Sequence, residues 1–140
     1  MNGIGNIKLI ALDSNIFIYN LEQNPEFVEF TDKIFTKLAS NKLKAVTSII
    51  TLTEILSYPK TEGVINQLRD DFKSTPNLSI FEVDEAIALE AANIRRHYRF
   101  RLPDSIQLAT AKLSKAKAFI SNDQRLKKFK ELKVILISEI

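Results

Sequence analysis

Five short apolar runs occur along the chain, and most are separated by stretches in which apolar residues recur every three or four positions. The runs, which have the length and composition of buried strands, are 7–12, 43–48, 78–83, 118–120 and 134–137. The periodic stretches between them indicate helices with one buried face. Helices between successive strands are typical of a parallel sheet that is covered on both sides. We therefore predict an α/β fold, a three-layer α/β/α sandwich around a mainly parallel five-stranded sheet.

Local signals place the ends of the predicted helices. Pro25 opens one helix, and another begins at Ile50 and stops by Leu56, because the residue before Pro59 is pushed away from helical backbone angles. Asp84 is well placed to cap a later helix. The side chains predicted to face inward are Phe27, Phe30, Ile34 and Leu38 in one helix, Val64, Leu68 and Phe72 in another, Val83, Ile87, Ala91, Ile94 and Tyr98 in a third, and Ile106, Ala109, Thr110 and Leu113 in a fourth.

The composition favours one compact domain over residues 1–140. The chain has 140 residues, of which 45% are hydrophobic, and we find no internal repeat or linker. The absence of cysteine excludes disulfides and thiolate metal sites and is compatible with the reducing cytoplasm. No apolar run reaches the length of a membrane span, so we expect no membrane partner.

Four acidic residues occur where strands end or helices begin. Asp13 and Asp123 directly follow predicted strands, and Glu54 lies one turn into the helix after the second strand. Asp104 lies in the first turn of a helix that starts at Pro103. Because functional groups of parallel sheets gather beyond the carboxyl ends of the strands, all four carboxylates can reach one edge.

Each acid also has a purely structural interpretation. Asp104 is favoured by the helix dipole, and Asp13 and Asp123 have the residue type and position of helix caps. Thr51 and Glu54 have the spacing of a capping box. The set is harder to explain in this way, because two carboxylates about 5 Å apart repel by roughly 3 kcal/mol at an effective dielectric constant of 20. Oxygen ligands without His or Cys suit Mg²⁺ or Mn²⁺, which indicates phosphoryl or phosphodiester hydrolysis.

The same residues carry a family resemblance that extends over nearly the whole chain. Its motifs are LDSN at 12–15, TEI at 53–55, LPDS at 102–105 with ATA at 109–111, and SND at 121–123. In this order and spacing they resemble the PIN domain family and, within it, the VapC-type toxin ribonucleases. Ser121 stands where such proteins frequently have threonine, and the hydroxyl is kept.

The resemblance implies a metal-dependent endoribonuclease, the toxin of a type II toxin-antitoxin pair. Asp13, Glu54, Asp104 and Asp123 would be both the catalytic residues and the ligands of Mg²⁺ or Mn²⁺, with Asn15 and Ser121 as polar supports. An activated water would attack the RNA phosphodiester and leave a 5′ phosphate and a 3′ hydroxyl. The resemblance also implies a homodimer and a separately encoded antitoxin, and the apolar face that begins at Phe27 is a further hint of dimerisation.

Basic residues form two groups that could bind RNA. The first is Arg95, Arg96, Arg99 and Arg101 with two aromatic residues between them, and the second includes Arg125 and Lys127. Cations at a helix C-terminus and a solvated face are the alternative interpretations. The net charge of +3 permits a polyanionic partner. We expect His97, the only histidine, to be solvated rather than a catalytic base.

Three other functions are compatible with such a fold. A haloacid dehalogenase-type phosphatase needs an acid two residues after its nucleophilic aspartate. Asn15 stands at that position, and its amide cannot exchange a proton. A receiver domain needs a lysine after a later strand. Here the fourth strand is followed by 121–123 (SND), which contains no lysine. A PIN-like module that binds RNA or protein without cutting would tolerate replacement of Asp104, whereas a nuclease would not.

Overall fold

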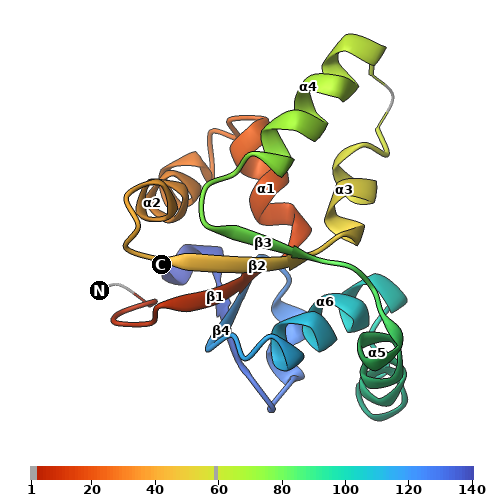
Figure 1. Cartoon of the computed structure of the whole chain (residues 1–140). Helices are drawn as coiled ribbons and strands as arrows, with labels where there is room; N and C mark the ends of the chain where they lie inside the picture. Colours follow the sequence, from red (N-terminus) through yellow and green to blue (C-terminus); the bar gives the residue numbers. More distant parts are fainter. Residues whose placement is uncertain (1–2, 59) are drawn as a thin grey trace.

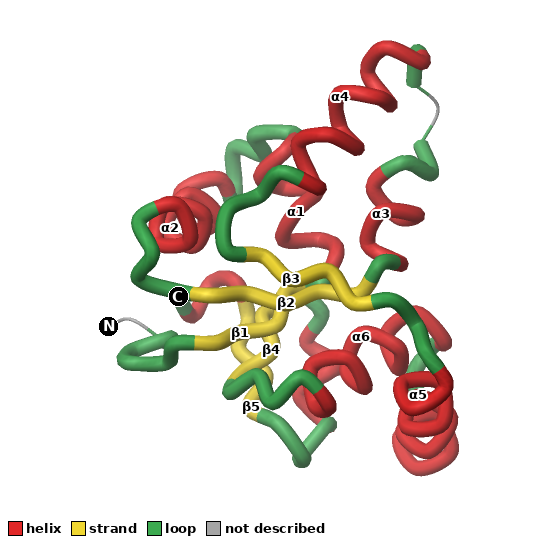
Figure 2. The backbone as a smooth tube through the Cα atoms, viewed as in Figure 1, coloured by secondary structure: helices red, strands yellow, loops and turns green. Residues whose placement is uncertain are grey.

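The chain folds around a five-stranded sheet in which every neighbouring pair of strands is parallel. The computed structural model describes residues 3–58 and 60–140. The strands are β1 (Leu9–Leu12), β2 (Lys44–Ser48), β3 (Leu78–Phe81), β4 (Ala118–Ser121) and β5 (Lys133–Leu136), in the spatial order β3-β2-β1-β4-β5 (Figure 2). The central strand β1 is therefore flanked by β2 and β4, with Ile10 opposite Ala45 on one side and Ala118 on the other.

Helices cover both faces of the sheet (Figure 1). One face carries α1 (Ser14–Leu21), α2 (Val28–Ala39), α3 (Ile50–Ile55) and α4 (Glu62–Lys73), and the other carries α5 (Glu85–Tyr98) and α6 (Leu102–Leu113). Two 3₁₀ turns, η1 (Gln124–Lys128) and η2 (Ile137–Glu139), follow β4 and β5. The predicted three-layer α/β/α fold with a parallel five-stranded sheet is confirmed.

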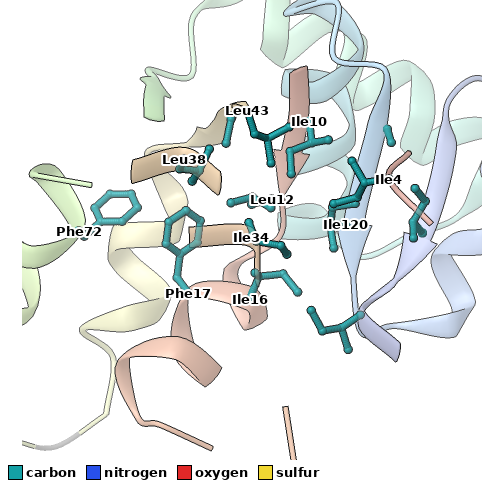
Figure 3. Close-up of a cluster of buried hydrophobic side chains, with 14 of the residues drawn as sticks. Ile4, Ile10, Leu12, Ile16, Phe17, Ile34, Leu38, Leu43, Phe72 and Ile120 are labelled. Carbon is teal, nitrogen blue, oxygen red and sulfur yellow. The ribbon is translucent and has the colours of Figure 1, made fainter. Parts of the chain in front are cut away.

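A separate apolar core fills each side of the sheet. Leu12, Ile16 and Ile34 belong to the core beneath α1 and α2, where the side chains point toward one another (Figure 3). There the ring of Phe17 meets the ring of Phe72 edge to face at 5.2 Å. The core on the α5 and α6 side is built around buried residues such as Leu108 and Phe119. The two cores hold β1 and β4 rigidly in the middle of the molecule, where strands are covered on both faces.

The predicted ends of the elements differ from the observed ones by a few residues. The third strand ends at Phe81 rather than at residue 83, and the fifth at Leu136, after which the chain turns into η2. The first helical turn of α2 begins at Val28, three residues beyond Pro25. The helix from Ile50 ends as predicted, although Pro59 itself lies outside the described residues.

Some side chains predicted to face inward are exposed. Val64 is 46% exposed, because α4 extends away from the sheet and buries only Phe72 near its C-terminal end (Figure 1). Leu113 is 44% exposed in the last turn of α6, and Val83 lies in the loop before α5. The apolar face of α2 packs against the chain's own core, where Ile34 and Leu38 are buried and Phe27 and Phe30 are partly buried. Among the described residues, no helix combines the length and apolar character that crossing a membrane requires.

Candidate active site

Asp13 lies at the C-terminal end of the central strand and begins α1 as its N-cap. Its Oδ1 accepts a hydrogen bond from the backbone N–H of Ser14 at 2.8 Å, and its Oδ2 accepts one from the Ser121 hydroxyl at 2.7 Å. The residue is only 7% exposed. Burial, together with the nearby charges of Asp104 and Glu54, raises the pKa of Asp13 to about 7 against the effect of these two hydrogen bonds.

Glu54 is connected to the same place through Ser14. The Ser14 hydroxyl donates to Oε1 of Glu54 at 2.7 Å and lies 3.4 Å from the Thr51 hydroxyl, so Ser14 joins the start of α1 to α3. The capping-box interpretation of Glu54 is wrong, because Ile49 is the N-cap of α3 and Thr51 lies inside the helix, where it is buried. The carboxylate therefore turns toward the end of β1 and away from its own backbone.

A buried glutamine, which the sequence analysis missed, ties these elements together. Gln107 on α6 is 2% exposed, and its Nε2 donates to the hydroxyl oxygens of Thr51 at 2.7 Å and Ser14 at 3.2 Å. Its Oε1 accepts from the backbone N–H of Ser48 at the end of β2, at 3.3 Å. Thr47 extends the network by donating to the carbonyl of Leu12 at 2.8 Å. The network fixes α1, α3 and α6 against the ends of β1 and β2.

Asp104 and Asp123 are held by arginines. Arg101 Nε donates to Oδ2 of Asp104 at 3.1 Å, and an Arg125 guanidinium nitrogen lies 3.6 Å from the same oxygen. Arg125 also forms a bidentate pair with Asp123, and its hydrogen bond lowers the pKa of that carboxyl. Asp104 is buried in the first turn of α6, as predicted, and Asp123 accepts a hydrogen bond from the Arg125 backbone N–H as the cap of η1.

The four predicted acids therefore gather at one edge of the sheet in two linked pairs. Asp13 and Glu54 share Ser14, while Asp104 and Asp123 share Arg125. Ser121 connects the pairs, because its Oγ accepts from the Asp123 backbone N–H at 3.0 Å while it donates to Asp13.

A divalent cation suits the donor chemistry of this edge. Asp13 is a buried carboxyl with a raised pKa beside two other acids, which is the situation that a bound cation relieves. The Oδ1 of Asn15 is buried and has no hydrogen-bond partner among the described residues. As placed, however, no three Asp, Glu, His or Cys side chains within residues 3–58 and 60–140 form a group that could hold one metal ion. Asp104 and Asp123 face Arg101 and Arg125, so the guanidinium groups supply the positive charge here.

The six basic residues predicted to bind RNA divide into two sets. Arg101, Arg125 and Lys127 are engaged in ion pairs, the last with Glu139 at 2.6 Å. The other three, on or directly after α5, are exposed and form no ion pair with any residue that the structure describes: Arg95, Arg96 and Arg99. His97 is exposed and its Nδ1 bonds the carbonyl of Asn93 at 2.8 Å, so it stays outside the acidic edge.

The fold and this edge define a class of protein, the parallel α/β domains whose strand ends carry an acidic, oxygen-rich site. The family model of the PIN domain matches residues 10–132. The match covers most of the chain, and the chain therefore belongs to the PIN domain family.

Solved structures of similar fold come from bacterial complexes. A chain of VapBC2 from Rickettsia felis, bound to a DNA fragment from its promoter, aligns with a TM-score of 0.71 and 19% identity over 91% of this chain and 98% of that one. A chain of a toxin-antitoxin complex from Klebsiella pneumoniae aligns with a TM-score of 0.70 and 21% identity over 94% of this chain and 99% of that one. A chain of DNA-bound VapBC from Salmonella typhimurium aligns with a TM-score of 0.67 and 15% identity over 94% of this chain and 98% of that one. At identities this low, the structural alignments show a common fold. Comparison with curated proteins gives no match.

We predict that replacing Gln107 with leucine lowers the free energy of unfolding by about 1–3 kcal/mol, because the buried N–H of Ser48 loses its acceptor and the hydroxyls of Thr51 and Ser14 lose a donor. Urea denaturation measures the change. The matched control is Gln67→Leu on α4, where the glutamine is exposed and the expected change is within about 0.5 kcal/mol. Equal effects of the two substitutions would contradict the role assigned to Gln107.

The raised pKa of Asp13 predicts a pH-dependent stability. Between its ordinary value of 3.8 and about 7 the folded state keeps a proton that the unfolded state loses, so stability falls as the pH rises through this window. The total loss above pH 7 is of the order of 4 kcal/mol. Asp13→Asn, which stays neutral, should therefore be more stable than the parent at pH 8 and similar to it at pH 4. Denaturation at both pH values tests this, and a gain of the same size at pH 4 would point to packing instead of charge.

Proposed function

We propose that the protein is a metal-dependent endoribonuclease, a VapC-type toxin that hydrolyses RNA phosphodiesters with Mg²⁺ or Mn²⁺. The observation that supports this most strongly is the burial of Asp13 beside Asp104 and Glu54, which leaves a carboxyl near neutral pKa at the C-terminal edge of the sheet. Membership of the PIN domain family supports the same class of activity.

Asp13, Asp104 and Asp123 would hold the metal, and Glu54 would complete the ligation or orient the attacking water. A bound divalent cation would lower the pKa of water and neutralise charge that develops on the phosphate oxygens. The chain's own groups supply placement: Ser121 and the Ser14 N–H fix both oxygens of Asp13, and the Ser14 hydroxyl orients Glu54. Water, and not the ribose 2′ oxygen, would attack, so the products would carry a 5′ phosphate and a 3′ hydroxyl.

Arg125 has to release its carboxylates before a cation can use them. Its guanidinium is exposed and bridges Asp123 and Asp104, so it can swing into solvent without breaking the core. The guanidinium side of each pair is open to solvent while the carboxylates are mostly buried, so a divalent cation would take the place of the guanidinium next to the same oxygens. The acids form no ready ligand set among the described residues, so the proposal requires this rearrangement of Arg125.

The cellular assignment follows from the family and the similar complexes. We propose a cognate antitoxin as protein partner, a homodimer as the assembly and the cytoplasm as the location. The structurally similar VapBC and toxin-antitoxin complexes support the antitoxin. The second candidate is a PIN-like module that binds RNA or protein without cutting it. The pairing of Asp104 with Arg101 and Arg125 favours this candidate, because the guanidinium groups stand where a metal ion would be needed.

The test is an assay of total RNA cleavage by the purified protein with Mn²⁺, with Mg²⁺ and with chelator. The Asp104→Asn variant is assayed under the same three conditions. We expect discrete fragments only with metal, and a loss of at least a hundredfold in rate for Asp104→Asn with folding intact. The matched control is Asp84→Asn, an exposed acid that caps α5 and that asparagine caps equally well. Equal activity of the parent and Asp104→Asn would favour the binding module.

A further inference from the structure

A cavity of about 610 Å³ lies between α5 and α6. Its apolar wall includes Ala91, Ala92, Phe100 and Leu102. Phe100 is fixed in this wall because its ring stacks on Tyr98 at 5.4 Å, and Tyr98 in turn contacts Phe129 at 5.1 Å. The cavity therefore has a rigid apolar wall that offers flat and aliphatic surface to a planar group.

The polar side of the cavity is purely cationic. Arg95, Arg96 and Arg99 line it, and none of its lining residues is acidic. These are the three arginines without an ion pair among the described residues, whereas Arg101 and Arg125 are committed to carboxylates. Unpaired guanidinium groups above an apolar wall complement a ligand that combines phosphate with a ring.

Arg99 stands in an unusual backbone conformation at this place. It is the C-cap of α5 with φ 60° and ψ 30°, a left-handed geometry that disfavours side chains and that glycine adopts freely. The chain thus keeps a guanidinium at a position where glycine would be more stable. Four other non-glycine residues of the described chain have the same sign of φ, so it is the position of Arg99 in the cavity that distinguishes it.

The cavity adjoins the acidic edge. Leu102, which lines it, is the first residue of α6, and Asp104 lies in the same helical turn. Arg101, directly before Leu102, contacts Asp104. Because residues two apart in a helix face different sides, an RNA strand that continues from the acids into the cavity has to cross the first turn of α6.

We propose that this cavity binds one unstacked nucleotide of a single-stranded RNA, next to the phosphodiester that is cut. The base contacts the apolar wall around Leu102, and the arginines hold the adjoining phosphates. Single-stranded recognition of this kind combines stacking surfaces with guanidinium contacts. The inference rests on the proposed ribonuclease function and adds a subsite to it.

The test compares Arg99→Gly with Lys115→Gly. Lys115 follows α6 with φ 66°, so both substitutions remove one cation from a left-handed residue, but only Arg99 lines the cavity. Binding of a short labelled single-stranded RNA is followed by fluorescence anisotropy in chelator at several salt concentrations. We expect Arg99→Gly to weaken binding about tenfold, to reduce the slope of log affinity against log salt by about 0.7 and to melt no lower than the parent. Lys115→Gly should bind RNA as the parent does.

A second pair of variants tests the base contact. Leu102 and Leu89 are both exposed, but only Leu102 lines the cavity. Leu102→Ser should weaken binding of the intact RNA several-fold and leave binding of an abasic RNA unchanged, and Leu89→Ser should alter neither. Equal effects of the two serine substitutions would overturn the base contact.

Other outcomes are equally decisive. Equal weakening by Arg99→Gly and Lys115→Gly would assign the effect to net charge and overturn the proposal. A change of sedimentation from dimer to monomer in Arg99→Gly would make the cavity an interface between copies and also overturn it. If the parent cleaves RNA while Arg99→Gly binds as tightly as the parent, only the subsite fails. If the parent neither binds nor cleaves RNA, the ribonuclease proposal fails with it.

Discussion

The structure depends most on the burial of the Asp13 carboxyl at the end of the central strand. A buried carboxylate is costly unless its oxygens are hydrogen-bonded or a cation lies nearby. Here β4 supplies the Ser121 hydroxyl and α1 supplies its first N–H, so the two elements that flank the end of β1 are held by one side chain. Both bonds lower the pKa of Asp13, yet burial and the neighbouring acids still raise it to about 7. The site keeps an unmet demand for positive charge.

The two halves of the acidic edge differ in the groups that face their carboxylates. Asp13 and Glu54 accept hydrogen bonds from neutral donors, and Gln107 bonds one of these donors, the Ser14 hydroxyl. Asp104 and Asp123 face Arg101 and Arg125, whose side chains are exposed. One half is thus preorganised and the other adjustable. A divalent cation that enters would use the fixed half and compete with Arg125 for the other.

Sequence patterns predict the layers and the acidic residues but not their partners. Apolar runs and helical periodicity are strong signals for strands and helices in the core, and the position of acids after strands follows from parallel topology. The spatial order of the strands carries no such local signal, because it depends on contacts between distant segments. Leu113 and Val64 show the limit of periodicity, since a helix that extends past the sheet has nothing to pack against at one end.

The polar network of the site is harder still to read from sequence. Gln107 bonds residues 93, 59 and 56 positions away, and an isolated glutamine in an amphipathic helix is ordinarily a surface residue. Arg125 carried a helpful signal, its position two residues after Asp123, but its proximity to Asp104 appears only in the fold. Buried polar partners are set by tertiary geometry.

Calorimetric titration of the protein with Mn²⁺ tests the central claim most directly, that the edge around Asp13 is a cation site kept short of positive charge. Near pH 7 a carboxyl with a pKa of about 7 is half protonated, so cation binding should release about half a proton from Asp13. The heat of binding should then vary with the ionisation enthalpy of the buffer at pH 7 and much less at pH 8.5, and Asp13→Asn should abolish the variation. Absence of binding, or binding at pH 7 without proton release, would contradict the account.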